Sequence, residues 1–234
     1  MDDVLTLQPL LPEAAFFPAN GRPNALNCAR DLINAKLSKF ACVVDRDFDD
    51  DPHLDLERVF PYLCQDLESM LIEIGCLGDL LPHYASAGKL VGKASVKAMI
   101  ADLCISASIV GNLRRANAAE RWGLAFDRVD LTSKIDKRTL ILNLPSYCAA
   151  LISVSDSRVT REQLLRAAQV ETERLVYSGK DVMAFVSVAL RRKYGSLSGQ
   201  ESSVEVLCPA LRACGSYKIA SISWFGELKA ILAA

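Results

Sequence analysis

The sequence of 234 residues has few of the residues from which zinc sites and disulfide scaffolds are built. It has only two histidines, His53 and His83, and none of its eight cysteines belongs to a Cys-x-x-Cys pair. Structural zinc sites use closely spaced cysteine and histidine ligands, so none is predicted. Most cysteines lie in apolar surroundings, as Cys42 and Cys104 do. We therefore expect buried free thiols in a reducing cytoplasm rather than disulfides.

Long apolar runs and an excess of one charge are also missing. No apolar run reaches the roughly 18 residues of a membrane span, and the longest, residues 99–111, is interrupted by Asp102 and by serines. The acidic first residues lack the basic segment of a signal peptide. The net charge is −1, so binding of nucleic acid would depend on local patches. We expect a cytoplasmic protein without a membrane segment, and the sequence leaves its oligomeric state open.

What remains is the composition of an ordinary globular protein, with 51% hydrophobic and 24% charged residues. The length suffices for one large or two small domains. No loop of the form GxxxxGK[ST] is present, so an ATPase acting with this chain would be a partner.

The pattern of apolar residues predicts an α/β first half and a mainly helical second half. In residues 1–85 it predicts three strands and two helices: strands 14–17, 40–44 and 59–63, and helices 23–37 and 66–75. Strand–helix–strand spacing of this kind implies parallel pairing with a right-handed crossover. In residues 86–234 it predicts helices at 88–119, 160–175, 181–192 and 224–232, a polar loop at 196–203, and short strands or extended loops at 125–129 and 140–144. A domain boundary is expected near residue 85.

Four acids follow the two central strands. Asp45 and Asp47 come directly after strand 40–44, and alternate residues of a strand point to one face. Two close carboxylates repel unless a cation lies between them, and Mg²⁺ prefers such oxygen ligands. Asp66 and Glu68 follow strand 59–63 at the same expected edge of the sheet, where ligands of parallel sheets bind.

These acids also have structural interpretations. Asp66 and Glu68 open a predicted helix, where an aspartate cap and a first-turn glutamate are ordinary stabilisers. Residues 49–51 are three further aspartates that we interpret as a solvated charge run. Two groups of basic residues are candidate phosphate-contacting faces: Arg114, Arg115 and Arg121 in one region, and Lys134, Lys137 and Arg138 in another. For any single one of them a normal surface charge is the preferred interpretation.

Two segments carry a family resemblance. The run Val43-Val44-Asp45-Arg46-Asp47-Phe48-Asp49, followed by Asp66-Leu67-Glu68-Ser69-Met70-Leu71, resembles toprim-type proteins encoded beside ABC-class ATPases in bacterial anti-phage systems. The toprim nuclease subunits of PARIS systems are the nearest group, and the overcoming-lysogenization-defect (OLD) nucleases are more distant. The segment Tyr177-Ser178-Gly179-Lys180-Asp181 is similar to a late helix-initiating segment of these proteins.

The resemblance implies a toprim-like parallel sheet and a metal-dependent nuclease acting on DNA or RNA with an OLD-like ATPase partner. Asp45 and Asp47 would hold Mg²⁺ or Mn²⁺, with Asp66 and Glu68 as further ligands, so that Asp45, Asp47 and Glu68 carry catalysis. Lys180 would contact a phosphate, although a solvated lysine beside Gly179 is the simpler interpretation. The family's early Glu-Gly-x-x-Asp motif is matched only by Asp3-Val4-Leu5, so we expect that a Glu-Gly stands upstream in a longer form or that catalysis has been lost.

Two other functions fit the same residues. The chain is alternatively a non-catalytic interaction or sensor subunit that keeps the fold and docks on an ATPase. A hydrophobic strand ending in Asp-x-Asp also opens haloacid-dehalogenase-type phosphatases, in which Asp45 would be the nucleophile and Asp47 the general acid/base. Against this, Asp49 stands where that family has threonine or valine.

Overall fold

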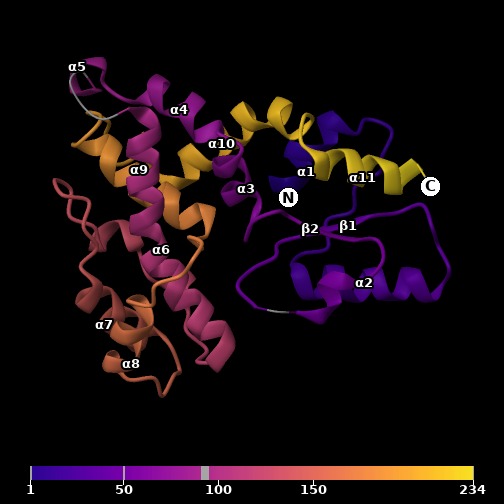
Figure 1. The fold of residues 1–234 in the computed structure, drawn as a ribbon, viewed down its shortest axis with the longest axis horizontal. Coiled ribbons are helices and arrows are strands. Elements are labelled where there is room, and N and C mark those ends of the chain that lie inside the picture. The colour runs from indigo at the N-terminus through magenta and orange to yellow at the C-terminus, as the bar shows by residue number, and fades with distance from the viewer. Residues whose placement is uncertain (1, 50, 91–94, 234) are drawn as a thin grey trace.

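A computed structural model describes residues 2–49, 51–90 and 95–233. These residues form a mixed α/β structure that is mostly helical, with a small parallel sheet. Figure 1 shows the sheet and α2 on one side of the molecule and most of the helices of the second half on the other. The α-helices are α1 (Asp2–Leu7), α2 (Arg22–Asn34), α3 (Leu67–Glu73), α4 (Cys76–Tyr84), α5 (Ala87–Leu90), α6 (Val96–Glu120), α7 (Leu144–Val154), α8 (Arg161–Ala168), α9 (Gly179–Arg191), α10 (Val204–Ile219) and α11 (Ser223–Ala233). The 3-10 helices are η1 (Gln8–Leu10), η2 (Pro52–Asp55), η3 (Phe126–Arg128) and η4 (Leu131–Lys134).

The sheet consists of two parallel strands, β1 (Cys42–Val44) and β2 (Val59–Pro61). Their pairing aligns Cys42 with Val59 and Val44 with Pro61, so the predicted parallel arrangement is confirmed, although both strands are shorter than expected. Helix α2 contacts β1, and its Ala25, Leu26 and Ala29 form a small separate core with Val44 and Val59. The predicted helix at 23–37 is thereby confirmed, with an end three residues earlier.

The strand expected at residues 14–17 is wrong. These residues are irregular, and Phe17 is 88% exposed. Pro12 and Pro18 flank the segment and have no amide hydrogen for a sheet, while alanine is a poor strand former. The expected strand–helix–strand crossover around α2 therefore does not form. Instead, β1 connects to β2 through residues 45–58, whose described part contains η2.

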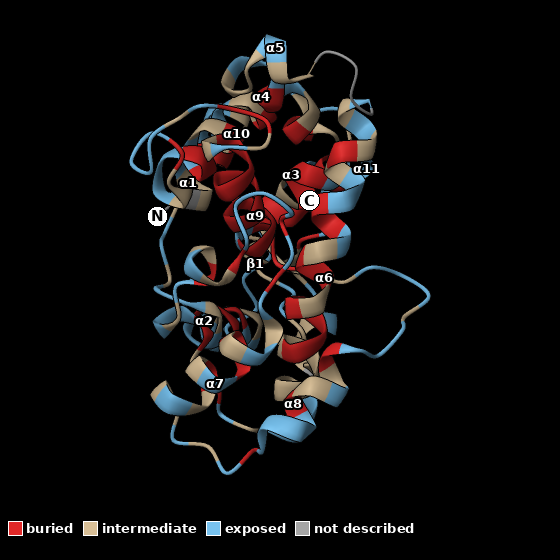
Figure 2. Ribbon diagram, turned by 90° about the vertical axis from the view of Figure 1, so that its left-hand side faces the viewer, coloured by how far each residue is buried: buried red, intermediate tan, exposed pale blue. Residues whose placement is uncertain are grey.

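The main core is centred on α9. This helix contacts α3, α6 and α10, and each of its residues from Val182 to Leu190 is buried. Figure 2 shows the buried segments of α3, α9 and α10 gathered in the interior. The core contains residues from both sides of residue 85, since α3 contacts α9 and α4 contacts α10. A domain boundary at that position stays a prediction.

The C-terminal helix α11 is attached to the small sheet. The indole nitrogen of Trp224 donates to the carbonyl of Pro61 at 2.9 Å, and the Trp224 ring lies against Tyr62. Arg58 donates to the carbonyl of Ile231 at 2.9 Å. The helix predicted at 224–232 is thus present, and it connects the end of the chain to the strand that leads to Asp66.

Several helices of the second half differ from the prediction. Residues 91–94 lie outside the described residues, so the helix expected at 88–119 is represented by α5 and α6. Helix α8 ends at Ala168 rather than at residue 175, because Val170 and Leu175 are 49% and 41% exposed and have no apolar surface to cover. Helices α7 and α10 were not predicted, whereas α9 and the 196–203 loop were.

The two candidate strands of the second half and the state of the thiols can also be compared with the structure. Residues 126–128 form η3, and Leu142 makes only an isolated bridge with Ile135, so neither candidate strand forms. All eight cysteines are free. Burial raises the pKa of the Cys104 thiol to about 11, as expected for an unreactive core cysteine.

Helix α6 is long and apolar enough to cross a membrane by length and composition alone. Half of its most apolar window is buried inside the protein, and the helix contacts α4, α8 and α9. Its hydrophobic side chains, such as Leu103, Val110 and Leu113, belong to the main core. This burial accounts for its apolar sequence, and the cytoplasmic location stays a prediction.

Candidate functional site

Asp45 and Asp47, the first two predicted metal ligands, lie in the loop after β1. The amide of Tyr62 donates to the carbonyl of Val44 at 3.1 Å, and the amide of Asp47 donates to the carbonyl of Gln65 at 2.9 Å. These bonds keep the segments after β1 and β2 side by side. Strand β1 ends before Asp45, and Asp47 has a positive φ of 56°. Strand alternation therefore does not continue to Asp47, whose side chain is 51% exposed and turned toward Arg22.

Asp45 is the most perturbed acid of the site. Burial raises its pKa to about 7, and the negative charges of Asp66, Asp3, Asp47 and Glu68 add to the rise. Within the described part of the chain, no hydrogen bond or ion pair involves its carboxylate. An ionised Asp45 is therefore unfavourable unless a cation or a proton neutralises it.

Asp66 caps helix α3. Its carboxylate accepts hydrogen bonds from the Ser69 amide at 2.7 Å, the Ser178 hydroxyl at 2.6 Å and the Gly179 amide at 3.0 Å. The capping interpretation of Asp66 is confirmed by these contacts. They also join the start of α3 to the start of α9, which are far apart in the sequence.

Glu68 forms a buried ion pair with Arg212 of α10. Two guanidinium nitrogens lie 2.8 and 2.7 Å from its Oε1 atom, and only 6% of the Glu68 side chain is exposed. Sequence reasoning missed this partner, because a single arginine in a helix that was not predicted has no local signature. Glu68 therefore lies near the other acids but is neutralised by the protein.

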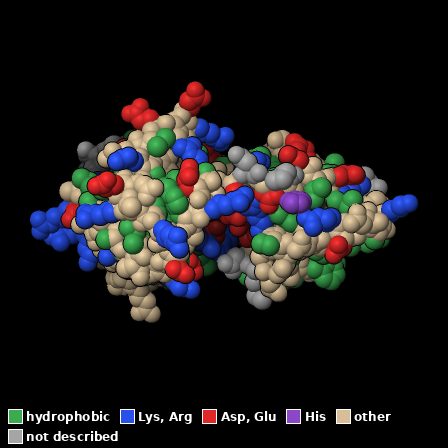
Figure 3. Space-filling view, turned by 90° about the horizontal axis from the view of Figure 1, so that it is seen from below, with side chains coloured by type: hydrophobic (Ala, Val, Ile, Leu, Met, Phe, Trp, Pro, Cys, Tyr) green, Lys and Arg blue, Asp and Glu red, His purple; other side chains and the backbone are tan. Residues whose placement is uncertain are grey.

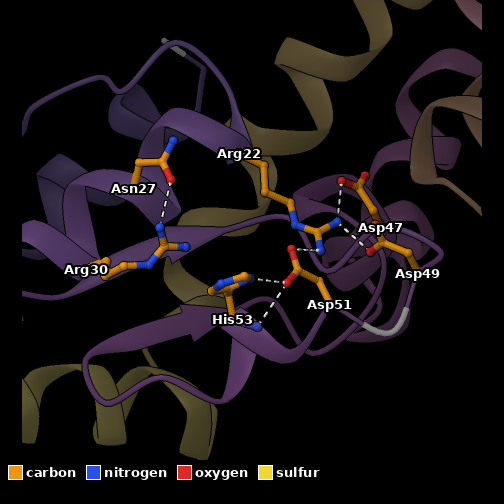
Figure 4. Close-up of polar contacts among 7 residues, drawn as sticks. All are labelled: Arg22, Asn27, Arg30, Asp47, Asp49, Asp51 and His53. Carbon is orange, nitrogen blue, oxygen red and sulfur yellow. Dashed lines mark hydrogen bonds and ion pairs between the residues drawn. The ribbon is translucent and has the colours of Figure 1, made fainter.

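Arg22 gathers the acidic loop that follows Asp45. Its guanidinium lies 2.9 Å from Asp47, 2.7 Å from Asp49 and 3.1 Å from Asp51, as Figure 4 shows. Asp51 also accepts from the backbone and the ring nitrogen of His53, at 2.9 and 2.8 Å. The expectation of a solvated charge run is thus wrong for Asp51, which is only 23% exposed, while Asp49 is exposed as expected but pairs with Arg22. Asp50 lies outside the described residues.

Lys180 and Asp181 begin helix α9 in different environments. Lys180 is exposed, whereas Asp181 is buried and accepts two hydrogen bonds from Arg114, at 2.7 and 2.8 Å. Arg114 therefore fixes α6 to α9 and is not the free phosphate-contacting residue considered above. Lys180 stays available for such a contact. Lys180 directly follows Gly179, whose amide donates to Asp66 at 3.0 Å, so its backbone lies close to that acid.

The acids fit a magnesium site only in part. Among the residues that the structure describes, no group of three or more metal-ligating side chains is arranged as a metal site. Asp45 suits a ligand of Mg²⁺, since its partly buried carboxylate lacks a protein partner among these residues. Asp47, Asp66 and Glu68 would each have to share or release the donor that they now contact.

Figure 3 shows acidic and basic side chains side by side in the recess between the two halves of the molecule. Comparison of the chain with protein-family models, with curated proteins and with solved structures finds no match. The class of protein must therefore be inferred from the residues of the site.

Proposed function

We propose that this chain is a metal-dependent nuclease with a toprim-like site, acting as the effector of an ATPase-coupled anti-phage system. The observation that carries the proposal is the position of Asp45, partly buried after the end of β1 and subject to the charges of Asp3, Asp47, Asp66 and Glu68. Such a group of acids is stabilised by a divalent cation. The parallel pairing of β1 with β2, with α3 following directly, supports a toprim-like arrangement.

In this proposal the residues of the site have distinct roles. Asp45 and Asp47 hold Mg²⁺ or Mn²⁺, with Asp66 and Glu68 as further ligands or as acceptors for metal-bound water. The metal, when bound, stabilises charge on the scissile phosphate and activates a water molecule. Lys180 contributes a positive charge to a phosphate of DNA or RNA. Ser178 and Gly179 hold Asp66 in position.

A second function is favoured by the ion pairs themselves. Arg212 neutralises Glu68 and Arg22 neutralises Asp47, which are the interactions expected if the acids stabilise the fold rather than bind a metal. The chain would then be a non-catalytic subunit that docks on an ATPase. A haloacid-dehalogenase-type phosphatase has less support, because Asp49 stands where that family has threonine or valine.

The decisive experiment measures cleavage of labelled DNA and RNA, single- and double-stranded, with Mg²⁺, Mn²⁺ or EDTA. Asp45→Asn removes the central carboxylate, and Asp156→Asn is the matched control, since Asp156 is exposed. Metal-dependent cleavage that Asp45→Asn abolishes and Asp156→Asn retains would support the nuclease. Cleavage that persists in Asp45→Asn would overturn the site. If Mn²⁺ neither binds nor supports cleavage, the non-catalytic alternative is favoured. Hydrolysis of an aryl phosphate would instead identify a phosphatase.

A further inference from the structure

A cavity of about 350 Å³ is lined in part by residues that neighbour the acids in the sequence, and it has no role in the function proposed above. Its walls come from segments that are distant in the sequence: the loop after β1, the loop between β2 and α3, the end of α3, and the segment that leads into α9. The lining residues that matter here are Arg46, Cys64, Gln65, Glu73, Arg174 and Tyr177. Arg46 stands between the predicted ligands Asp45 and Asp47, and Gln65 directly precedes Asp66.

Two arginines bring positive charge to this cavity. Arg46 is oriented by the hydrogen bond from its Nε atom to the carbonyl of Tyr62, at 3.2 Å. That bond uses one donor and leaves the two terminal nitrogens without a partner among the described residues. The Arg174 guanidinium likewise has no side-chain partner in the described part of the chain. Both arginines line this cavity, and both charges act on the Cys64 thiol, although the two residues are far apart in the sequence.

The acid that lines the cavity does not cancel this charge. Glu73 accepts a hydrogen bond from the Tyr177 hydroxyl at 2.8 Å, which orients its carboxylate. The lining therefore carries two positive charges and one negative charge. Guanidinium groups with free, fork-shaped donors are suited to phosphate oxygens, and a volume near 350 Å³ admits a nucleotide-sized group.

We propose that this cavity binds a phosphate of a single nucleic-acid strand, adjacent to the phosphodiester held at Asp45, with Arg46 and Arg174 as the phosphate-binding residues. The inference rests on the nuclease proposal for the identity of its ligand. Its geometric basis is that Arg46 and Gln65 line the cavity and directly adjoin the acids in the chain, and that the Gln65 carbonyl accepts a hydrogen bond from the Asp47 amide at 2.9 Å. A strand that crosses the acids would present its neighbouring phosphate to the two arginines, which compensate for the negative potential of the acids.

The test measures binding of a fluorescein-labelled single-stranded oligonucleotide by anisotropy in EDTA, where metal-dependent cleavage does not occur. Arg46→Gln and Arg174→Gln are each expected to weaken binding roughly tenfold, as is typical when a charge-assisted hydrogen bond is removed. The slope of log K against log salt concentration should decrease by about 0.7 for each phosphate that the variant no longer neutralises. Arg158→Gln, at an exposed arginine outside the cavity, should leave both quantities unchanged.

The outcomes separate the cavity from the catalytic proposal. If Arg46→Gln and Arg174→Gln keep their melting temperatures and bind the oligonucleotide as the wild type does, the cavity proposal is overturned. It is also overturned if orthophosphate or a mononucleotide binds through these arginines but the oligonucleotide does not. If Asp45→Asn binds normally and no form of the chain cleaves, the cavity stands and the nuclease proposal fails. If the wild type and both arginine variants cleave equally well, the nuclease proposal stands and the cavity proposal fails.

Discussion

Glu68 and Arg212, 144 residues apart in the sequence, meet in an ion pair of 2.7 Å that is almost completely buried. The pair attaches α3, which carries Glu68 and is capped by Asp66, to α10 of the second half. Any metal that used Glu68 would have to compete with this arginine. The same contact therefore affects both the stability of the fold and the chemistry of the site.

Arg212→Gln should destabilise the protein, because it leaves the Glu68 carboxylate buried without its countercharge. Breaking a buried pair on one side costs about 3–5 kcal/mol in the free energy of unfolding. The double variant Arg212→Met/Glu68→Leu should recover most of that stability, since it removes both charges. Urea unfolding of the single and double variants measures the difference, and equal destabilisation in both would show that the ion pair is not the cause.

Gly179→Ala should destabilise the junction between α3 and α9. A Cβ atom at this position would clash with the Cβ of Glu68 and the backbone of Ser69, which are too close to move apart without shifting α9. Overpacking of this kind costs about 1–3 kcal/mol. Gly226→Ala is the matched control, because nothing lies within 4 Å of a Cβ placed there in α11. Thermal melting of both variants tests the close approach, and an unchanged Gly179→Ala would contradict it.

Asp45 should make stability depend on pH in the metal-free protein. Burial and the neighbouring acids raise its folded-state pKa to about 7, above the value of about 3.9 in an unfolded chain. The folded state therefore binds the proton more tightly. This contribution to stability is complete below about pH 4 and is lost as the pH rises to about 7.

Asp45→Asn cannot ionise and should not show this pH dependence. Between pH 5 and pH 8 the wild type should lose about 2 kcal/mol of unfolding free energy relative to the variant. Saturating Mn²⁺ should stabilise the wild type more at pH 8 than at pH 5, because the cation binds the ionised form. Asp156→Asn serves as the control. Parallel stability profiles for wild type and Asp45→Asn would contradict the raised pKa.

Arg22→Gln should loosen the acidic loop without unfolding the protein. The guanidinium contacts Asp47, Asp49 and Asp51, so its removal leaves these carboxylates to repel one another. Hydrogen exchange of the amides at residues 46–49, 51 and 53–55 should become faster. Arg30→Gln, on the same helix, removes only a contact with Asn27 and should leave this loop unchanged. Equal exchange in the two variants would show that Arg22 does not hold the loop.

The pattern of apolar residues along the sequence was sufficient to predict the elements that depend mainly on neighbouring residues. The apolar runs at 40–44 and 59–63 predicted β1 and β2, and helical periodicity predicted α2, α9 and α11. The aspartate before α3 was recognised as a cap candidate from its position alone, and the structure shows the cap. These features depend on neighbours within a few residues.

Elements whose stability comes from distant contacts were missed or misplaced. Helix α10 contains Pro209, and its helical state depends on packing against α3, α4 and α9. The apolar segment 14–17 has a strand-like composition but no partner strand among the described residues, so it stays irregular.

For the candidate site, the sequence by itself determined that Asp45 follows a buried strand and that Asp66 and Glu68 open the helix after the next one. Only the tertiary structure decided what these acids contact: Asp66 with Ser178, Glu68 with Arg212, and Asp47 with Arg22. A strand or helix is specified by interactions along a short stretch of chain. An ion pair between residues far apart exists only once packing has excluded water and brought the two charges together.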